Sequence, residues 1–102
     1  MNVVLNIEYP LGVELHKEHI KFVMEKLQIE ENNIFMSSRY NGSWVWALTD
    51  VDSKVYVDSI KSIADYFTDL HNKGFVQYFY IGEITAPIPD KWKLMLFSVC
   101  GY

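Results

Sequence analysis

Cysteine is nearly absent from this chain, because Cys100 is the single one among 102 residues. One cysteine cannot form an internal disulfide, so the sequence excludes the small secreted scaffolds that such bridges hold together. The N-terminal residues carry no basic region and no long apolar run, unlike a signal peptide. No stretch approaches the roughly 20 apolar residues that cross a bilayer. We therefore expect a cytoplasmic protein that does not enter the membrane.

Basic residues are also few, with 9 Lys and Arg against 13 Asp and Glu and a formal net charge of −4. They are spread along the chain without a cluster. Nucleic-acid binding requires a basic surface, so the charge argues against DNA and RNA as partners. It argues equally against an anionic membrane surface. An acidic protein of this kind fits a partner with a basic surface.

Motifs that carry chemistry are missing. The chain has no Gly-x-Gly-x-x-Gly, no phosphate-binding loop and no Gly-x-Ser-x-Gly elbow. Asp50 and Asp52 suggest a cation loop, but an EF-hand needs glycine and glutamate at its sixth and twelfth positions. Counted from Asp50, those positions are Val55 and Lys61. We therefore interpret the aspartates as helix-capping residues.

The histidines do not form a convincing metal site. His16 and His19 are spaced as neighbours on a helix, but zinc requires three or four ligands. His71 belongs to the far end of another helix, and Cys100 lies near the end of the chain. We expect surface or boundary histidines, no metal, no cofactor and no catalytic residues. An enzyme would require Cys100, a histidine and a carboxylate to converge in a cleft.

The composition predicts a single folded domain over residues 1–102, because half of the residues are hydrophobic and 16% are aromatic. Alternating apolar residues predict a strand over 2–8, and helical spacing of apolar residues predicts a helix over 14–28. The Asn41-Gly42 pair predicts a hairpin that joins strands 34–40 and 43–49.

A second helix is expected to end near Gly74, which suits a left-handed cap. Residues 55–57 are either its first turn or a short extra strand, with the helix then capped at Asp58. Strands are expected over 75–81 and 93–99. The order predicts an α+β fold, a ferredoxin-like β-α-β-β-α-β sandwich. In it, two helices cover one face of an antiparallel sheet, and an extra C-terminal strand is added.

The hairpin also predicts which side chains share a face. A two-residue turn pairs Arg39 with Trp44 and Ser37 with Trp46, and side chains alternate between faces. Burying an unpaired Arg39 under the helices would cost several kcal/mol. We therefore predict that Arg39, Trp44 and Trp46 point away from the helices.

The same alternation predicts the remaining residues of each face. Asn6, Glu8, Tyr78 and Tyr80 are expected on the open face. Val45, Ala47, Phe75, Phe79 and Ile81 are expected in the core. As an alternative, the last strand, with Trp92 and Phe97, or the loop 84–91 covers the open face.

Such a face predicts protein binding, since Trp, Tyr and Arg are favoured anchors at interfaces. The expected partner-binding residues are Arg39, Trp44, Trp46, Tyr78, Tyr80, Glu8 and Asp50. We expect a non-catalytic protein-binding module, more specifically a small acidic inhibitor or immunity-type protein that masks a basic partner such as a nuclease. The sequence leaves open whether the protein forms a homodimer. The alternative is a dimeric small-ligand-binding regulatory domain.

Overall fold

We describe the protein from a computed structural model. The structure describes residues 1–10, 17–36, 43–85 and 93–94. The elements, in chain order, are β1 (Asn2–Glu8), α1 (Lys17–Leu27), the 3₁₀ turn η1 (Glu31–Asn33), β2 (Ile34–Met36), β3 (Ser43–Leu48), α2 (Ser53–Asn72), β4 (Tyr78–Ile84) and β5 (Lys93–Leu94).

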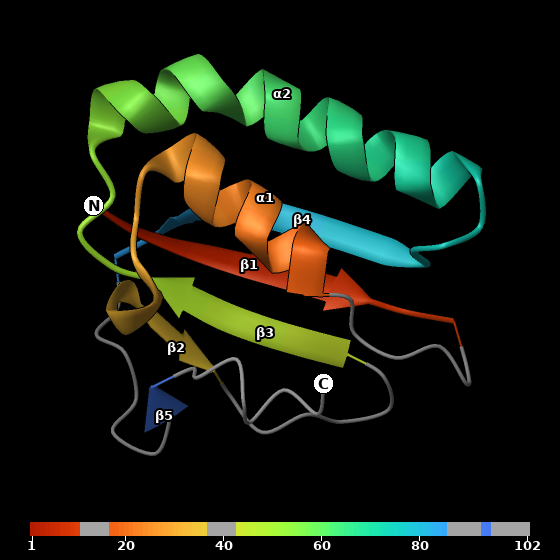
Figure 1. Cartoon of the computed structure of the whole chain (residues 1–102), viewed down its shortest axis with the longest axis horizontal. Coiled ribbons are helices and arrows are strands. Elements are labelled where there is room, and N and C mark those ends of the chain that lie inside the picture. The colour runs from red at the N-terminus through yellow and green to blue at the C-terminus, as the bar shows by residue number, and fades with distance from the viewer. Residues whose placement is uncertain (11–16, 37–42, 86–92, 95–102) are drawn as a thin grey trace.

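The strands form one antiparallel sheet in the order β4-β1-β3-β2-β5, and both helices lie on the same side of it (Figure 1). Both β1 and β2 run antiparallel to β3, so α1 joins two parallel strands that have β3 between them. The helix α2 joins β3 and β4 across β1 in the same way. The predicted α+β class, with an antiparallel sheet and two helices on one face, is confirmed.

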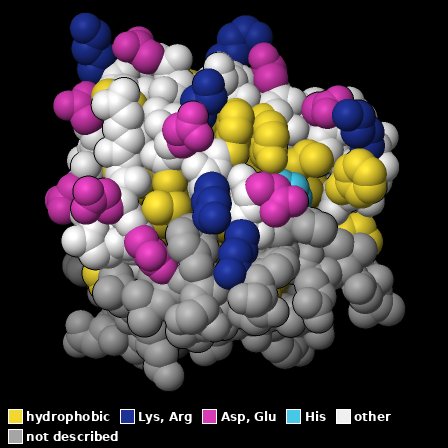
Figure 2. All heavy atoms as spheres, in the orientation of Figure 1, with side chains coloured by type: hydrophobic (Ala, Val, Ile, Leu, Met, Phe, Trp, Pro, Cys, Tyr) yellow, Lys and Arg dark blue, Asp and Glu magenta, His cyan; other side chains and the backbone are white. Residues whose placement is uncertain are grey.

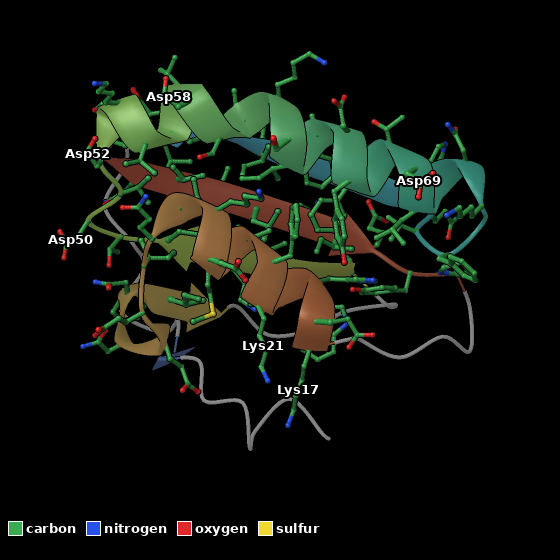
Figure 3. The ribbon with its side chains drawn as sticks, turned by 45° about the horizontal axis from the view of Figure 1, so that its top comes forward. Lys17, Lys21, Asp50, Asp52, Asp58 and Asp69 are labelled. Atoms are coloured by element: carbon green, nitrogen blue, oxygen red, sulfur yellow. The ribbon has the colours of Figure 1, made fainter. Side chains whose placement is uncertain are left out.

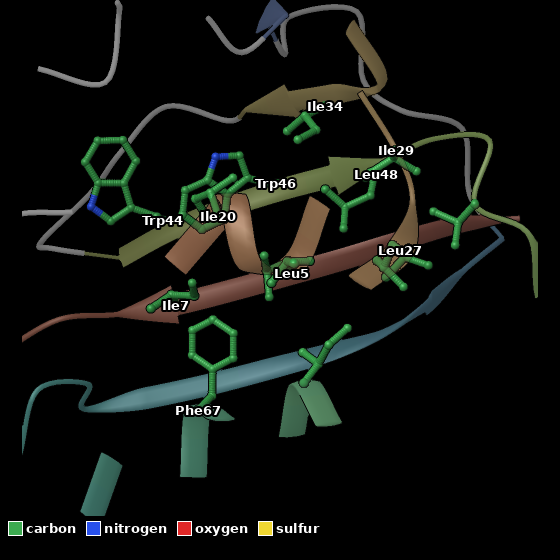
Figure 4. Packing of buried hydrophobic residues seen from close by; sticks show 14 of the residues in the cluster. Leu5, Ile7, Ile20, Leu27, Ile29, Ile34, Trp44, Trp46, Leu48 and Phe67 are labelled. Atoms are coloured by element: carbon green, nitrogen blue, oxygen red, sulfur yellow. The ribbon is translucent and has the colours of Figure 1, made fainter. Parts of the chain in front are cut away.

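The core lies between the sheet and the helices (Figure 4). Along β1, Val3, Leu5 and Ile7 are buried and the residues between them are not, as the alternation predicts. The sheet is covered by α1, which buries Ile20, Val23 and Leu27, and by α2. From α2, Phe67 stacks on Phe79 of β4 with 4.4 Å between the ring centroids. The helical spacing of apolar residues that predicts the first helix is therefore confirmed at its buried centre.

The start of α2 is fixed by a side-chain cap. The Asp52 carboxylate accepts hydrogen bonds from the backbone N–H groups of Lys54 and Val55, at 2.9 and 3.1 Å. These bonds satisfy donors that have no partner within the helix. Residues 55–57 are thus helical, and the alternative of a short strand with a cap at Asp58 is wrong.

Because of the way α2 ends, the next strand begins later in the chain than the predicted start at residue 75. Gly74 has a left-handed φ of 81°, as predicted for a helix end. The backbone N–H groups of Phe75 and Val76 then both donate to the carbonyl of Leu70, at 2.9 and 3.4 Å. Because these residues still close the helix, β4 begins at Tyr78. Phe75, predicted in the core, is instead 55% exposed, whereas Phe79 and Ile81 pack against the core as predicted.

Within the described ranges, neither helix combines the length and the apolar character that spanning a bilayer requires.

We expect Phe67→Ala to lower the free energy of unfolding by about 3–5 kcal/mol, because it leaves a cavity beneath α2. Urea unfolding followed by circular dichroism measures this loss. Val57→Ala, at an exposed position of the same helix, is the matched control and should stay within about 0.5 kcal/mol of the wild type. Equal losses in the two variants would contradict the core position of Phe67.

Candidate functional site

Trp44 and Trp46 lie in the core, so the prediction that they face away from the helices is wrong. Trp46 is 0% exposed and Trp44 is 7% exposed. In the sheet, Leu5 pairs with Trp46 and Ile7 pairs with Trp44. Directly opposed residues of antiparallel strands share a face. The two indoles, stacked with centroids 6.0 Å apart, therefore join the buried face of β1.

The error arises from the register of the hairpin. The predicted register, which pairs Ser37 with Trp46, continues with Met36 opposite Ala47, whereas in the structure Met36 pairs with Trp46 and Phe35 with Ala47. A shift of one residue exchanges the two faces. Val45 and Ala47, predicted in the core, consequently lie on the face opposite the helices, where Ala47 is nevertheless buried, at 0% exposed. Arg39 lies outside the described residues, and the register removes the reason to place it beside Trp44.

Burial of the indoles is energetically favourable even though it leaves one polar atom without a partner. An aromatic side chain of this size removes 150–250 Å² from water, which contributes about 4–6 kcal/mol at 25 cal/mol per Å². Among the described residues, the indole Nε1–H of Trp46 has no hydrogen-bond acceptor. Such a loss costs about 1–3 kcal/mol, which is less than the burial of the indole contributes.

Tyr78 and Tyr80 do face away from the helices, as predicted. They are 46% and 49% exposed, and they pair with Glu8 and Asn6 on β1. The Ser43 hydroxyl of β3 donates to the Asn6 side-chain oxygen at 3.2 Å, which places this serine on the same face. We call Asn6, Glu8, Tyr78 and Tyr80 the tyrosine surface.

The ring of Tyr80 lies flat along its own strand. A Cβ atom at Gly82 would meet the Tyr80 ring, with the Cζ atom only 3.0 Å away. The absence of a side chain at Gly82 therefore leaves room for this ring. Burial raises the pKa of Tyr56 on α2, and Tyr80 and Glu83 raise it further.

Asp50 is not part of this surface. It follows the far end of β3, where its backbone has a left-handed φ of 57° and its carboxylate accepts from the Asn33 side chain at 3.3 Å. Glu8 and Tyr78 lie at the opposite end of β1. Six residue steps of about 3.3 Å separate the two ends by about 20 Å, and Asp50 accordingly projects at one extremity of the molecule (Figure 3).

A groove adjoins Tyr78 between the end of α2 and β4. It has a volume of about 250 Å³ and is lined by Phe67, Thr68, His71, Gln77, Tyr78 and Phe79. The His71 Nδ1 atom lies 3.0 Å from the carbonyl oxygen of Val76. Because a carbonyl only accepts hydrogen bonds, this Nδ1 carries the proton and donates. The histidine therefore ties the turn that precedes β4 to the last turn of α2.

A second hollow, which the sequence reasoning missed, lies between α1 and α2. We call it the helix cleft; its volume is about 340 Å³, and Glu18, His19, Tyr66, Leu70 and Phe75 line it. Figure 2 shows hydrophobic side chains gathered between the two helices, with an acidic side chain and a histidine beside them. A cleft of this size is at the lower end of the range that small ligands occupy.

His19 is only 5% exposed, so the prediction that it is a surface or boundary residue is wrong. Its Nδ1 atom lies 2.7 Å from the Tyr9 hydroxyl oxygen, and its ring stacks on that of Tyr9. Tyr66 and Phe67 approach the imidazole edge-on, with centroids 5.9 and 6.0 Å away. A signal was available, because His19 precedes the buried Val23 and Leu27 by four and eight residues. His16 lies outside the described residues.

No metal centre is found in the described ranges, where no three His, Cys, Asp or Glu side chains gather closely enough to hold an ion. Cys100 lies outside these ranges. Comparison of the chain with protein-family models, with curated proteins and with solved structures gives no match.

Tyr66 makes the helix cleft sensitive to alkaline pH. Burial raises the pKa of its phenol above 10, and the Glu18 carboxylate raises it further. The folded state therefore favours the neutral phenol. This contribution to stability is complete below the unfolded pKa and is lost as pH rises through the folded value. We expect the free energy of unfolding to fall less steeply above pH 10 in Tyr66→Phe than in the wild type.

Urea unfolding at closely spaced pH values measures this difference. In Glu18→Gln the loss should begin at the same pH but should be smaller and complete at a lower pH than in the wild type, because one cause of the raised folded-state pKa is gone. Identical pH profiles for the wild type and Tyr66→Phe would contradict the proposed coupling.

Proposed function

We propose that this chain is a non-catalytic protein-binding module whose contact surface is the tyrosine surface. The observation that carries the proposal is the half-exposure of Tyr78 and Tyr80, two residues apart on a regular strand. They stand beside Asn6 and Glu8 on the face of the sheet that the helices leave free. Large aromatic side chains exposed side by side are typical of interaction surfaces.

Tyrosine suits this role because it combines a large contact area with few rotatable bonds and one polar end. The Tyr80 ring lies against Gly82, so part of its ordering is complete before a partner arrives. Tyr78 borders the groove beneath the end of α2. In this proposal, a protruding side chain of the partner enters this groove beside Tyr78.

The net charge of −4 supports a basic partner. Glu8, directly opposite Tyr78, would attract such a partner at the rim of the contact. In its specific form, the proposal is a small acidic inhibitor or immunity-type protein that masks a basic partner such as a nuclease. Asp50, on the far side of the molecule, contributes only to the long-range field in this proposal.

We also propose that the chain has a ferredoxin-like fold. The order β4-β1-β3-β2, with each helix joining parallel strands across a third, supports a ferredoxin-like sandwich to which β5 is added beside β2. This fold carries many unrelated functions, so it does not by itself select one.

Self-association is a second candidate, and it is the arrangement that a dimeric regulatory domain would use. Among the described strands, none pairs with the outer edge of β4, which is seven residues long. The strand has no lysine and no proline, the residues that commonly protect such edges. An antiparallel contact between two copies centred on Ile81 would set Tyr80 opposite Gly82 and would oppose no like charges.

The partner proposal predicts that the tagged wild-type chain captures a protein from the lysate of its source organism and that Tyr78→Thr/Tyr80→Thr does not. With the purified partner, each single change should weaken binding about 30-fold, as for an anchor that contributes 2 kcal/mol. Calorimetry measures this. Glu8→Gln should mainly slow association with a basic partner, and added salt should have the same effect.

Val57→Ala is the control, because it alters an exposed apolar residue on the opposite side of the molecule. All variants are first compared with the wild type by circular dichroism. If the folded double variant retains the same partner as the wild type, the tyrosine surface is not the contact.

The second candidate predicts a mass that doubles with concentration for the purified chain alone. Light scattering coupled to size exclusion measures it. Tyr80→Lys should keep the chain monomeric, because a lysine would then stand at the paired edge. A monomeric wild type at millimolar concentration would rule out this candidate and leave the partner proposal intact.

A further inference from the structure

Strand β4 is the outermost strand on its side of the sheet, and none of the described strands pairs with its outer edge. On the inner edge, all seven residues pair with β1 in one unbroken register. The strand therefore contains no bulge of the kind that commonly ends pairing at an edge. Phe67 of α2 packs on Phe79 of this strand (Figure 4). Such a regular edge is a template for a further strand.

The direction of the backbone groups of β4 follows from hydrogen bonds deeper in the sheet. The Thr49 N–H donates to the Asn33 carbonyl at 2.8 Å, in the register of β3 with β2. Residues of a strand direct their backbone groups to alternate sides, so the even-numbered residues of β1 bond to β4. The Gln77 N–H, which donates to the Glu8 carbonyl at 2.7 Å, agrees with this. The residues of β4 whose N–H and carbonyl groups point to the outer edge are therefore Phe79, Ile81 and Glu83.

The groove between α2 and β4 opens along this outer edge. Tyr66 stacks on Phe22 of α1, so its side of α2 faces α1. Thr68 follows Tyr66 by two residues, which is about 200° around the helix, and it lines the groove together with residues 77–79. The groove is therefore on the side of α2 away from α1. Because consecutive residues of an extended chain point to alternate faces, a hollow that touches all three residues lies at the margin of the strand.

The edge and the groove together define the strand that would fit. On an antiparallel neighbour, the residues opposite Phe79, Ile81 and Glu83 point to the helix side of the sheet. The side chain opposite Phe79 would enter the groove against the rings of Phe67 and Phe79, which favours an apolar residue. Glu83 is exposed, which favours a basic residue opposite it.

A second copy of β4 does not supply this pattern. An antiparallel contact centred on Ile81 sets the Glu83 of one copy opposite the Phe79 of the other. A carboxylate would then stand beside the apolar groove, where its loss of water is costly, and no cation would reach Glu83. The net charge of −4 likewise favours a basic segment of another protein over a second acidic chain.

We propose that the outer edge of β4 binds an extended segment of the partner protein as an added antiparallel strand. An apolar side chain of this segment occupies the groove, and a basic side chain lies beside Glu83. The backbone hydrogen bonds provide affinity and the groove provides selectivity. This proposal rests on the protein-binding proposal and names the form in which the partner binds. The remaining side chains of the added strand would lie beside Tyr78 and Tyr80, so the tyrosine surface continues the same contact.

Amide hydrogen exchange of the monomeric chain, followed by NMR, tests whether the edge is open. We expect the amides of Phe79, Ile81 and Glu83 to exchange quickly. Those of Tyr80 and Gly82, which bond to β1, should exchange slowly. Slow exchange at Ile81 in the free chain would show that the edge is already paired, and it would overturn the proposal.

The binding probe is the peptide acetyl-Thr-Lys-Thr-Val-Thr-Leu-Thr-amide. Its lysine, valine and leucine would stand opposite Glu83, Ile81 and Phe79. Titrated into the ¹⁵N-labelled chain, it should shift the β4 amides in a saturable way, with a Kd of about 1 mM for so short a segment. It should also slow exchange at Ile81.

Two methylated peptides separate strand addition from simple apolar contact. N-methylation of the valine removes the N–H that would donate to the Ile81 carbonyl, so it should weaken binding at least about 10-fold. N-methylation of the threonine that follows is the matched control, because its N–H would point away from β4. Equal effects of the two methyl groups would overturn the proposal. So would the absence of a saturable shift at about 10 mM of the unmethylated peptide, ten times the expected Kd.

Variants of the chain test the two side-chain contacts. Thr68→Phe fills the groove and Glu83→Lys reverses the charge, both at exposed positions. Each should weaken peptide binding about 5-fold. Ser62→Phe, on the side of α2 that faces α1, and Glu25→Lys, on α1, are the matched controls and should leave the affinity unchanged. Equal losses in variants and controls would contradict the placement of the strand.

The natural partner distinguishes failure of this proposal from failure of the protein-binding proposal. A partner that is lost by Tyr78→Thr/Tyr80→Thr but retained with full affinity by Thr68→Phe/Glu83→Lys would overturn the added strand and leave the tyrosine surface as the contact. A partner whose affinity falls about 25-fold in Thr68→Phe/Glu83→Lys, the product of the two single effects, would support the added strand.

Discussion

The pairing of β1 with β3 is the constraint on which the rest of this structure depends. It sets Leu5 opposite Trp46 and Ile7 opposite Trp44, so the largest side chains of β3 join the apolar face of β1. Both helices then cover this one face. Neighbouring residues of a strand point in opposite directions. Because Phe79 and Ile81 of β4 face the helices, the tyrosines beside them lie on the other side of the sheet. The helix cleft has its position for the same reason, since it lies where α1 and α2 meet above the core.

Periodicity alone predicts the elements of this fold and much of its core. The alternation in β1 and the helical spacing of Ile20, Val23 and Leu27 depend on one segment each, and both predictions are confirmed. The hairpin prediction depends on the relation between two strands. There the register differs by a single residue, which is enough to exchange the faces. With Arg39 directly opposite Trp44, the cost of burying an arginine favours the wrong face for the tryptophans.

The candidate site was predictable only in part, for a related reason. Tyr78 and Tyr80 alternate with Phe79 and Ile81 along one strand, so their outward direction follows from the sequence. The helix cleft joins Glu18 and His19 of α1 to Tyr66 and Leu70 of α2 and to Phe75 beyond it. No local pattern encodes how two helices lie against each other. The position of His19 in line with Val23 and Leu27 could have shown its burial, but not the cleft beside it.

The central position of β1 has a consequence for the way this chain acquires its structure during synthesis. Leu5 pairs with Trp46 on one side and with Ile81 on the other, 41 and 76 residues later in the chain. Because β1 is made before β3 and β4, it cannot pair on both sides until β4 has been translated. Contacts between such distant segments slow folding, because long loops must close before the strands can pair. Until then the apolar face of β1 is a surface on which a chaperone could act.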